Sequence, residues 1–335
     1  FDCDAAVRTA RLAAEMARAT GVRGIRWIEA DALVVEAQCT RLLGHSESAR
    51  EVGRHALLLA EELGVAAVQL RALAVLGAIE TDYHPVAARA TLARRLALAR
   101  KEHSREQIAD TLCLQAQLQG WEDPASAQRS LAEALAIYRD MAAADSQAYV
   151  SGLLAELGIR RGDLAAARRH AEAAVSLRPT DRETQTLASN LTTLGTVLLL
   201  QGEVAAGKRR LSDAIALVQQ FQGDAATAKY ALAEGMIAVG ESSAALELAR
   251  SIPRVDQPAD ALILTLEAVA LSQLGRGPEA IATVERAERA FGDSDTPRFA
   301  HRARVNLAGV KLRHAGAAVA ARARRELSAR ASEAD

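Results

Sequence analysis

A small residue returns at a nearly constant interval along this chain, each time on a segment with helical periodicity. The residues in this series are Ala49, Ala88, Ala127, Ala167, Gly207, Ala245, Ala280 and Ala321, and the steps between them are 39, 39, 40, 40, 38, 35 and 41 residues. Self-similarity at such a period is typical of solenoids, in which stacked helical hairpins share one continuous core. The sequence therefore predicts a solenoid.

Within each copy, small residues recur at offsets of 0, 4 and 7 positions. The clearest sets are Ala6/Ala10/Ala13, Ala49/Gly53/Ala56, Ala127/Leu131/Ala134, Ala167/Ala171/Ala174 and Gly207/Leu211/Ala214. These offsets place the residues on one helix face, where low bulk allows a neighbouring helix to approach closely. The segments around Arg95 and Arg325 depart from this small-residue pattern.

Prolines and glycines mark the expected helix ends. Pro85, Pro124, Pro278 and Pro297 suit the first turn of a helix, where a missing N–H costs nothing. Asp123, Asp163 and Thr296 fit N-cap positions, and Thr180 with Glu183 fits a capping box. Glycines that suit helix ends with positive φ are Gly44, Gly64, Gly120, Gly162, Gly202, Gly240, Gly275 and Gly316.

These signals predict one all-α domain over residues 1–335, a solenoid of about eight helical hairpins preceded by an orphan helix at 4–19. The abundance of Ala and Leu favours helix over strand. The expected repeats span 24–63, 65–103, 105–143, 146–178, 184–220, 224–252, 258–291 and 297–330. Their first helices are expected at 24–43, 65–80, 105–119, 146–160, 184–201, 224–239, 258–274 and 297–315.

The net charge and the cysteines limit which binding partners and which cellular compartment are expected. The net charge is −1 and the pI is about 6.8, so the chain lacks the overall attraction typical of proteins that bind nucleic acid or anionic membranes. Trp27 and Trp121 stand alone and suit packing rather than base stacking. Three widely spaced cysteines suit a reducing cytoplasm. The chain begins at Phe1 without a leader, which we interpret as part of a longer protein.

Only one segment imitates a catalytic or nucleotide-binding motif. Residues 202–208 match the start of a phosphate-binding loop, but Arg209 stands where that motif needs Ser or Thr. The seven histidines show no metal-ligand spacing, and no nucleophile elbow or marked acidic pair is present. We therefore expect no cofactor, no metal and no enzymatic active site within this chain.

Two segments carry a resemblance to a known family. Leu191, Leu194, Gly195 and Leu198, followed by Gly202, Gly207, Leu211 and Ala214, match the Leu, Gly and small positions of a tetratricopeptide repeat (TPR) in order. Gly162, Asp163, Ala167, Ala171, Ala174 and Pro179 match them a second time. The chain resembles TPR arrays of the longer-period type found in bacterial signalling and regulatory proteins. This resemblance implies a right-handed α-α superhelix whose first helices line a concave groove for peptides, protein segments or small effectors.

By that alignment, the groove is expected to carry polar residues from several first helices. They are Gln38, Thr192, Thr196, Tyr230, Glu234, Asn306 and Arg313. The resemblance implies a protein or peptide segment, or a small effector, as the partner, with a homodimer as a further option. No nucleic acid and no membrane is expected to bind.

The final residues suggest a connection to an output domain. The stretch 322–335 resembles the helix that leads into a diguanylate cyclase (GGDEF) domain, which would make this chain the sensory half of a bacterial signalling protein. The alternatives are the regulatory solenoid of a transcription activator or peptide receptor, and a free-standing adaptor. Residues 298–330 carry nine Lys or Arg residues against one Glu, which suits either a polar end cap or a docking surface.

Overall fold

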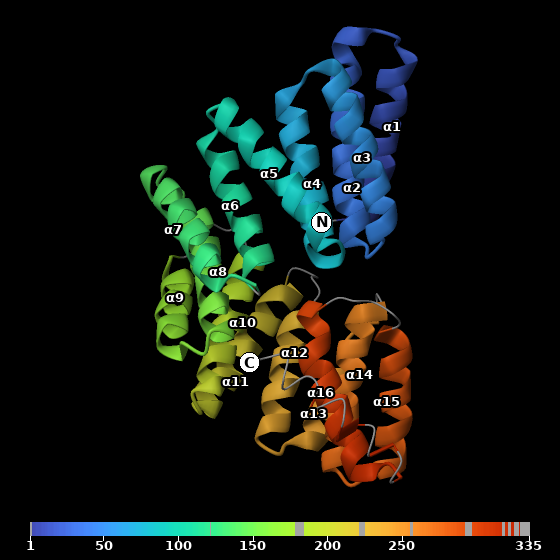
Figure 1. The fold of residues 1–335 in the computed structure, drawn as a ribbon, viewed down its shortest axis with the longest axis vertical. Coiled ribbons are helices and arrows are strands. Elements are labelled where there is room, and N and C mark those ends of the chain that lie inside the picture. The colour runs from blue at the N-terminus through green and yellow to red at the C-terminus, as the bar shows by residue number, and fades with distance from the viewer. Residues whose placement is uncertain are drawn as a thin grey trace. The chain divides into compact units, whose positions relative to one another are not determined.

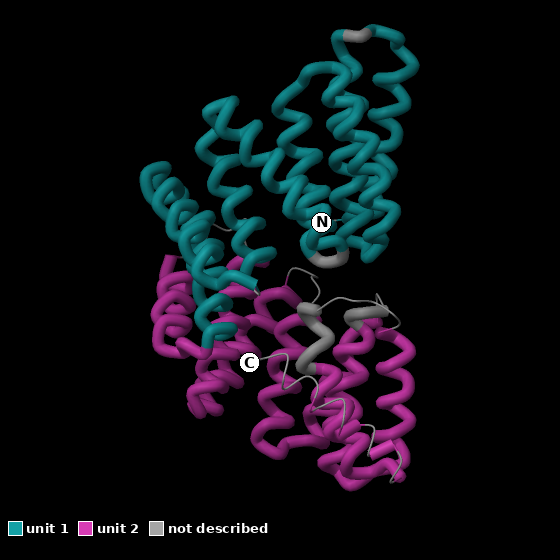
Figure 2. Tube along the Cα trace, viewed as in Figure 1, with its two compact units in different colours: residues 1–161 teal, residues 162–335 magenta. Residues whose placement is uncertain are grey.

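The computed structural model describes residues 2–120, 122–177, 184–220, 225–254, 257–291, 297–316, 319–320, 323–324 and 328. These residues form sixteen α-helices and a 3-10 turn, η1 (Arg23–Ile25), and contain no strand (Figure 1). The chain divides into two compact units, residues 1–161 and 162–335 (Figure 2). The all-α solenoid class predicted from the sequence is confirmed, while a single domain over 1–335 stays a prediction.

Unit 1 is a stack of antiparallel helices in chain order, each packed on the next. Its helices are α1 (Cys3–Ala19), α2 (Arg26–Leu42), α3 (Ser46–Leu63), α4 (Ala66–Tyr83), α5 (Pro85–Lys101), α6 (Arg105–Gln119), α7 (Pro124–Asp140) and α8 (Ala144–Arg160). The even-numbered helices α2, α4, α6 and α8 also contact one another in sequence, so they form one wall of the stack. This wall corresponds to the first helices of the predicted repeats.

Unit 2 repeats the same pattern. Its helices are α9 (Leu164–Ser176), α10 (Thr184–Leu200), α11 (Val204–Gln220), α12 (Ala226–Ala238), α13 (Ser242–Arg250), α14 (Gln257–Gln273), α15 (Gly277–Phe291) and α16 (Pro297–His314). Here α10, α12, α14 and α16 contact one another in sequence. Within both units the ends of the first helices agree with the predicted ranges to within three residues.

The small-residue face is the seam between helices. Ala127, Ala134, Ala167 and Ala174 have no solvent exposure. Gly207 shows why bulk is excluded, since a Cβ atom there would lie 2.8 Å from the carbonyl oxygen of Gly195 on the neighbouring helix. The repeat interval thus records the positions where second helices touch first helices.

Most helix ends have the predicted chemistry. Gly64 and Gly162, like five other glycines, have φ values in the left-handed region that glycine adopts without strain. The Asp123 and Asp163 carboxylates accept hydrogen bonds from backbone N–H groups three residues later, at 2.9 Å. Pro85 begins α5, as predicted.

Two elbows lack glycine and place another residue in the left-handed region. His103, between α5 and α6, and Ala142, between α7 and α8, both have φ of 53°. A residue with a Cβ atom is strained in this conformation. The hairpin geometry is therefore retained at some conformational cost.

Three expectations are corrected. On α1 the buried face is Ala10/Ala14/Ala17 rather than Ala6/Ala10/Ala13, because alanines occupy both frames and the sequence does not distinguish them. Gly120 at the end of α6 has φ of −58°, and Gly316 after α16 also lacks the expected positive φ. Trp27 is 45% exposed and is not a packing anchor.

Several expectations lie outside the described residues. They concern Trp121, Pro179, Thr180, Glu183, Thr296, Ala321 and Arg325. The second helix of the last predicted repeat is described at only a few positions. Among the described residues, no helix is long and apolar enough to cross a bilayer.

Candidate functional site

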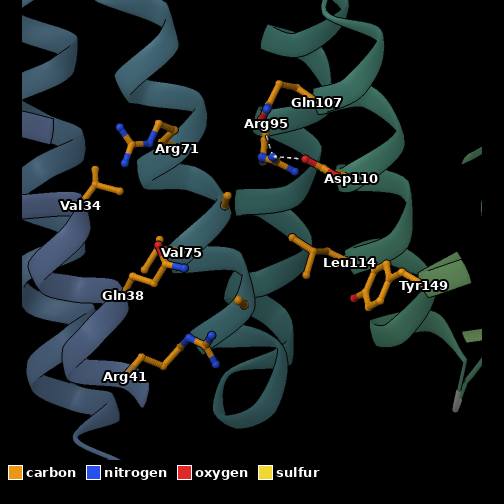
Figure 3. A pocket seen from close by; sticks show the side chains of 12 residues that line it. Val34, Gln38, Arg41, Arg71, Val75, Arg95, Gln107, Asp110, Leu114 and Tyr149 are labelled. Carbon is orange, nitrogen blue, oxygen red and sulfur yellow. Dashed lines mark hydrogen bonds and ion pairs between the residues drawn. The ribbon is translucent and has the colours of Figure 1, made fainter. Parts of the chain in front are cut away.

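A cavity of about 360 Å³ lies along the first-helix wall of unit 1. Its polar lining residues are Gln38, Arg41, Arg71, Arg95, Gln107, Asp110 and Tyr149, and its apolar ones are Val34, Ala74, Val75, Ala78 and Leu114. They come from α2 and α4 on one side and from α6 and α8 on the other, with Arg95 added from α5 (Figure 3). This volume lies in the lower part of the range found for ligand sites.

Arg95 is the unusual member of this lining because it belongs to a second helix. It occupies the last position of the Ala88/Leu92/Arg95 set, where α7 has Ala134 and α9 has Ala174. Its side chain is only 2% exposed, and Figure 3 shows it extended from α5 to the residues of α6. Where α7 and α9 have an alanine that packs between helices, α5 thus has an arginine whose guanidinium lies beside the cavity.

The Arg95 guanidinium is held by acceptors on both neighbouring first helices. Nε donates to the carbonyl oxygen of Leu70 at 3.2 Å, Nη1 to Thr111 Oγ1 at 2.7 Å, and Nη2 to Gln107 Oε1 at 2.6 Å. Nη2 also lies 3.7 Å from Asp110 Oδ2. Burial lowers the pKa of Arg95, and the Asp110 carboxylate counteracts this shift. These bonds fix α4, α5 and α6 to one another beside the cavity.

Asp110 connects the cavity to the core beneath it. Its carboxylate accepts a hydrogen bond from the Tyr138 hydroxyl as well as facing Arg95. Burial, and then this hydrogen bond, raise the pKa of Tyr138. Burial also raises the pKa of the neighbouring Cys113 thiol to about 12. Cys113 is therefore protonated at neutral pH and is no nucleophile.

The remaining two arginines of the cavity differ in their surroundings. Arg71 forms an ion pair with Asp31. Arg41, in the last turn of α2, is half-buried, and its Nε is buried without a hydrogen-bond partner among the described residues. The Tyr149 hydroxyl accepts a hydrogen bond from Gln117 Nε2 at 3.0 Å, and burial raises its pKa, so it keeps its proton.

Of the residues expected in the groove, Gln38 is the one that lines this cavity. It lies on α2 and is exposed. The other six lie in unit 2, so the structure does not bring all seven together within one unit. The sequence pattern did mark Arg95, as a break in the small-residue series, but did not reveal that its side chain reaches the groove wall.

The two threonines expected in the groove lie one turn apart on α10. Thr192 Oγ1 donates to the carbonyl oxygen of Ala188 at 2.8 Å, and Thr196 Oγ1 donates to that of Thr192 at 2.9 Å. Thr192 borders a small cavity of about 90 Å³. Both hydroxyl protons are used within the helix itself.

The other four expected residues are distributed over α12 and α16. Tyr230 and Glu234 lie one turn apart on α12 and are half-buried, with Tyr230 packed against the core of unit 2. Asn306 is half-buried on α16, and Arg313 is exposed near the end of that helix. Arg313 borders a cavity of about 800 Å³ that is lined by α15, the end of α16 and the residues after it.

The segment that imitates a phosphate-binding loop is a hairpin elbow. Gly202 has φ of 83°, Gly207 is buried against α10, and the preceding apolar run is helix rather than strand. Lys208 Nζ lies 2.5 Å from Glu241 Oε2. Each of these residues thus has a structural role. Among the described residues, no group of three or more His, Cys, Asp or Glu side chains is placed to hold a metal ion.

Comparison with known proteins adds support at the level of fold. No protein-family model and no curated protein sequence matches the chain. Among solved structures, the chain is similar to BtubC (BKLC) from P. vanneervenii, with a TM-score of 0.54 and 17% identity over 67% of this chain and 93% of that one.

It is also similar to a Signal Transduction ATPase with Numerous Domains (STAND) protein with a tetratricopeptide repeat sensor, PH0952 from Pyrococcus horikoshii. The TM-score is 0.56 and the identity 12%, over 91% of this chain and 52% of that one. The chain therefore spans about half the length of the STAND protein. At these identities the likeness shows the fold: an all-helical, TPR-like solenoid.

Proposed function

We propose that this chain is a non-catalytic binding module, in which the first-helix wall of unit 1 holds a protein or peptide segment. The single observation that carries the proposal is the cavity lined by successive first helices, with Gln38, Arg41 and Tyr149 facing it. Solenoids present extended surfaces of this kind to chain segments. The polar groups supply specificity, and the alanines and valines between them supply apolar contact.

The acidic residue of the lining and the thiol in the core beneath it favour binding over catalysis. The best-connected acidic group, Asp110, is engaged by Arg95 and Tyr138, and the Cys113 thiol is held protonated. A general base needs an acceptor free to take a proton, and a nucleophile needs activation by such a base. Asp110 and Cys113 meet neither requirement.

A regulatory role in a larger signalling protein is the context that we propose for this module. The similarity to a STAND protein with a tetratricopeptide repeat sensor favours a sensor or activator solenoid, and it is a likeness of fold. Control of a diguanylate cyclase output remains a prediction from the last residues of the sequence alone. A homodimer, a small effector as the ligand and a cytoplasmic location are likewise predictions.

The proposal is tested by thermal-shift screening of the purified chain against peptide and metabolite libraries. A ligand that binds only the folded state raises the melting temperature by mass action. A hit whose effect is lost in Ala78→Phe, which fills the cavity, is the expected result. Ala136→Phe, at an exposed position on α7, is the matched control and should respond as the parent does.

Two outcomes would contradict the proposal. One is the absence of any peptide that shifts the melting temperature at high concentration. The other is a set of peptide hits that bind Ala78→Phe and the parent equally, since those ligands would then occupy another surface.

A further inference from the structure

The three arginines of the unit 1 cavity are not equivalent. Arg95 donates to three acceptors, and Arg71 is paired with Asp31. Arg41 has neither kind of partner: its Nε–H is buried beside the cavity, and no described residue accepts a hydrogen bond from its side chain or forms an ion pair with it. A buried donor without an acceptor is unfavourable, so an acceptor that a ligand brings to this guanidinium would be bound favourably.

Other groups that line the cavity also offer hydrogens. Tyr149 receives a hydrogen bond from Gln117, which leaves its own O–H to donate. The Gln38 side chain is exposed and has no hydrogen bond to another described residue, so its amide can donate or accept. The acidic lining residue, Asp110, faces Arg95 and Tyr138 instead. The hydrogen-bonding groups of the lining that remain available to a ligand are therefore mainly donors.

We infer that this cavity binds a carboxylate side chain of an acidic protein segment, and that Arg41 is the residue that receives it. The inference rests on the proposed function and names the class of its ligand. A carboxylate is a planar acceptor that matches the donor edge of a guanidinium. Asp31 offsets the charge of Arg71 and Asp110 that of Arg95, so the charge of Arg41 remains and an anion also fits the lining. Residues from four successive first helices line the cavity, which suits an extended chain more than a compact metabolite.

The experiment is selection of binding peptides from a random displayed library, followed by fluorescence polarisation with the selected peptide. We expect Asp or Glu to be enriched at one fixed position. Replacing that residue by Asn or Gln should weaken binding about tenfold or more, as should Arg41→Gln in the protein, because either change removes a charge-assisted bond. Combining both changes should add little, since they remove the same contact.

The matched control is Arg129→Gln, at an exposed arginine on α7 outside the cavity lining. It should leave the affinity within about twofold of the parent. Both Arg41→Gln and Arg129→Gln are expected to retain the parent melting temperature, so a loss of affinity in Arg41→Gln would not be due to misfolding.

Each other outcome overturns a defined part of the account. Selected peptides that bind at the cavity without an acidic preference, or acidic peptides that bind Arg41→Gln as tightly as the parent, would overturn this inference and leave the proposed function standing. A library that yields no binder would overturn both. Free glutamate that stabilises the parent but not Arg41→Gln would show a small carboxylate as the ligand and would contradict the protein-segment assignment.

Discussion

Helices α5 and α9 have the same place in the repeat, but their buried sets differ, most of all at the last position. In α9 the set Ala167/Ala171/Ala174 is fully buried and makes a plain packing seam. In α5 the set is Ala88/Leu92/Arg95, and the arginine passes between α4 and α6 to border a cavity. One side chain at a repeat position therefore separates a helix that only packs from a helix that also helps to build a site.

A solenoid can thus gain a candidate site at one repeat without a change of architecture. Each helix packs against the first helix that follows it, and each keeps its buried first alanine. What changes is the polar network on the first-helix side, where Gln107, Asp110 and Thr111 are arranged around the Arg95 guanidinium. The departure from the repeat, rather than the repeat itself, marks the candidate site.

The largest effect is expected for Arg95→Ala. The change removes three hydrogen bonds, leaves Thr111 and Gln107 without their donor and opens space at the seam, so we expect a loss of about 2–4 kcal/mol in the free energy of unfolding. Urea denaturation followed by circular dichroism measures it. Arg94→Ala, at the adjacent exposed arginine paired with Glu61, should cost at most about 1 kcal/mol. Equal midpoints for the two variants would contradict the role given to Arg95.

A somewhat smaller loss is expected for Ala174→Leu at the equivalent position of α9. Extra bulk on a face with no exposure overpacks the seam and should cost about 1–3 kcal/mol. The control is Ala173→Leu, one residue earlier on the exposed face, which should be nearly neutral. Thermal melting of both variants checks the difference. A parent melting temperature for Ala174→Leu would contradict the assignment of this face to the contact between helices.

The elbows beside these helices give the next prediction. The elbow after α5 places His103 at φ of 53°, whereas the elbow before α9 has Gly162 at φ of 71°. His103→Gly should relieve left-handed strain and stabilise the protein by about 0.5–1 kcal/mol, after the entropy cost of glycine is subtracted. Gly162→Ala should destabilise it by about 1 kcal/mol. In chemical denaturation the two variants should change the free energy of unfolding in opposite directions. A change in the same direction for both would contradict backbone strain at His103 as the cause.

The smallest effect is expected for Arg41→Gln in the absence of ligand. Arg41 has no partner among the described residues to lose, so the free energy of unfolding should stay within about 0.5 kcal/mol of the parent value. Denaturation of this variant beside Arg95→Ala separates the two arginines of one cavity. A loss as large as that of Arg95→Ala would mean that Arg41 is structural.

The fold was largely predictable because its signals are local and repeated. The interval between small residues, the prolines at Pro85 and Pro124 and the caps at Asp123 and Asp163 each depend on a few neighbouring residues. The first-helix ranges follow from them. The frame on α1 was wrong because its neighbouring alanines supply more than one such frame, and only packing against α2 selects Ala10, Ala14 and Ala17.

The site was much less predictable because it depends on where long side chains extend. Gln38 was expected in the groove and lines the cavity, but the hydroxyls of Thr192 and Thr196 donate to their own helix. Arg41, Arg71 and Tyr149 resemble ordinary polar residues in the sequence, and no local pattern shows that they border one cavity. The break at Arg95 was visible, whereas its acceptors on α4 and α6 follow only from the packed structure.

The most direct test of the central claim is the nuclear magnetic resonance spectrum of the arginine Nε–H groups during titration with a selected acidic peptide. The Arg41 signal is assigned by its loss in Arg41→Gln, and that of Arg129 by its loss in Arg129→Gln. We predict that the peptide shifts the Arg41 signal in proportion to its binding and leaves the Arg129 signal in place. A peptide that binds while the Arg41 signal stays unmoved would contradict the claim.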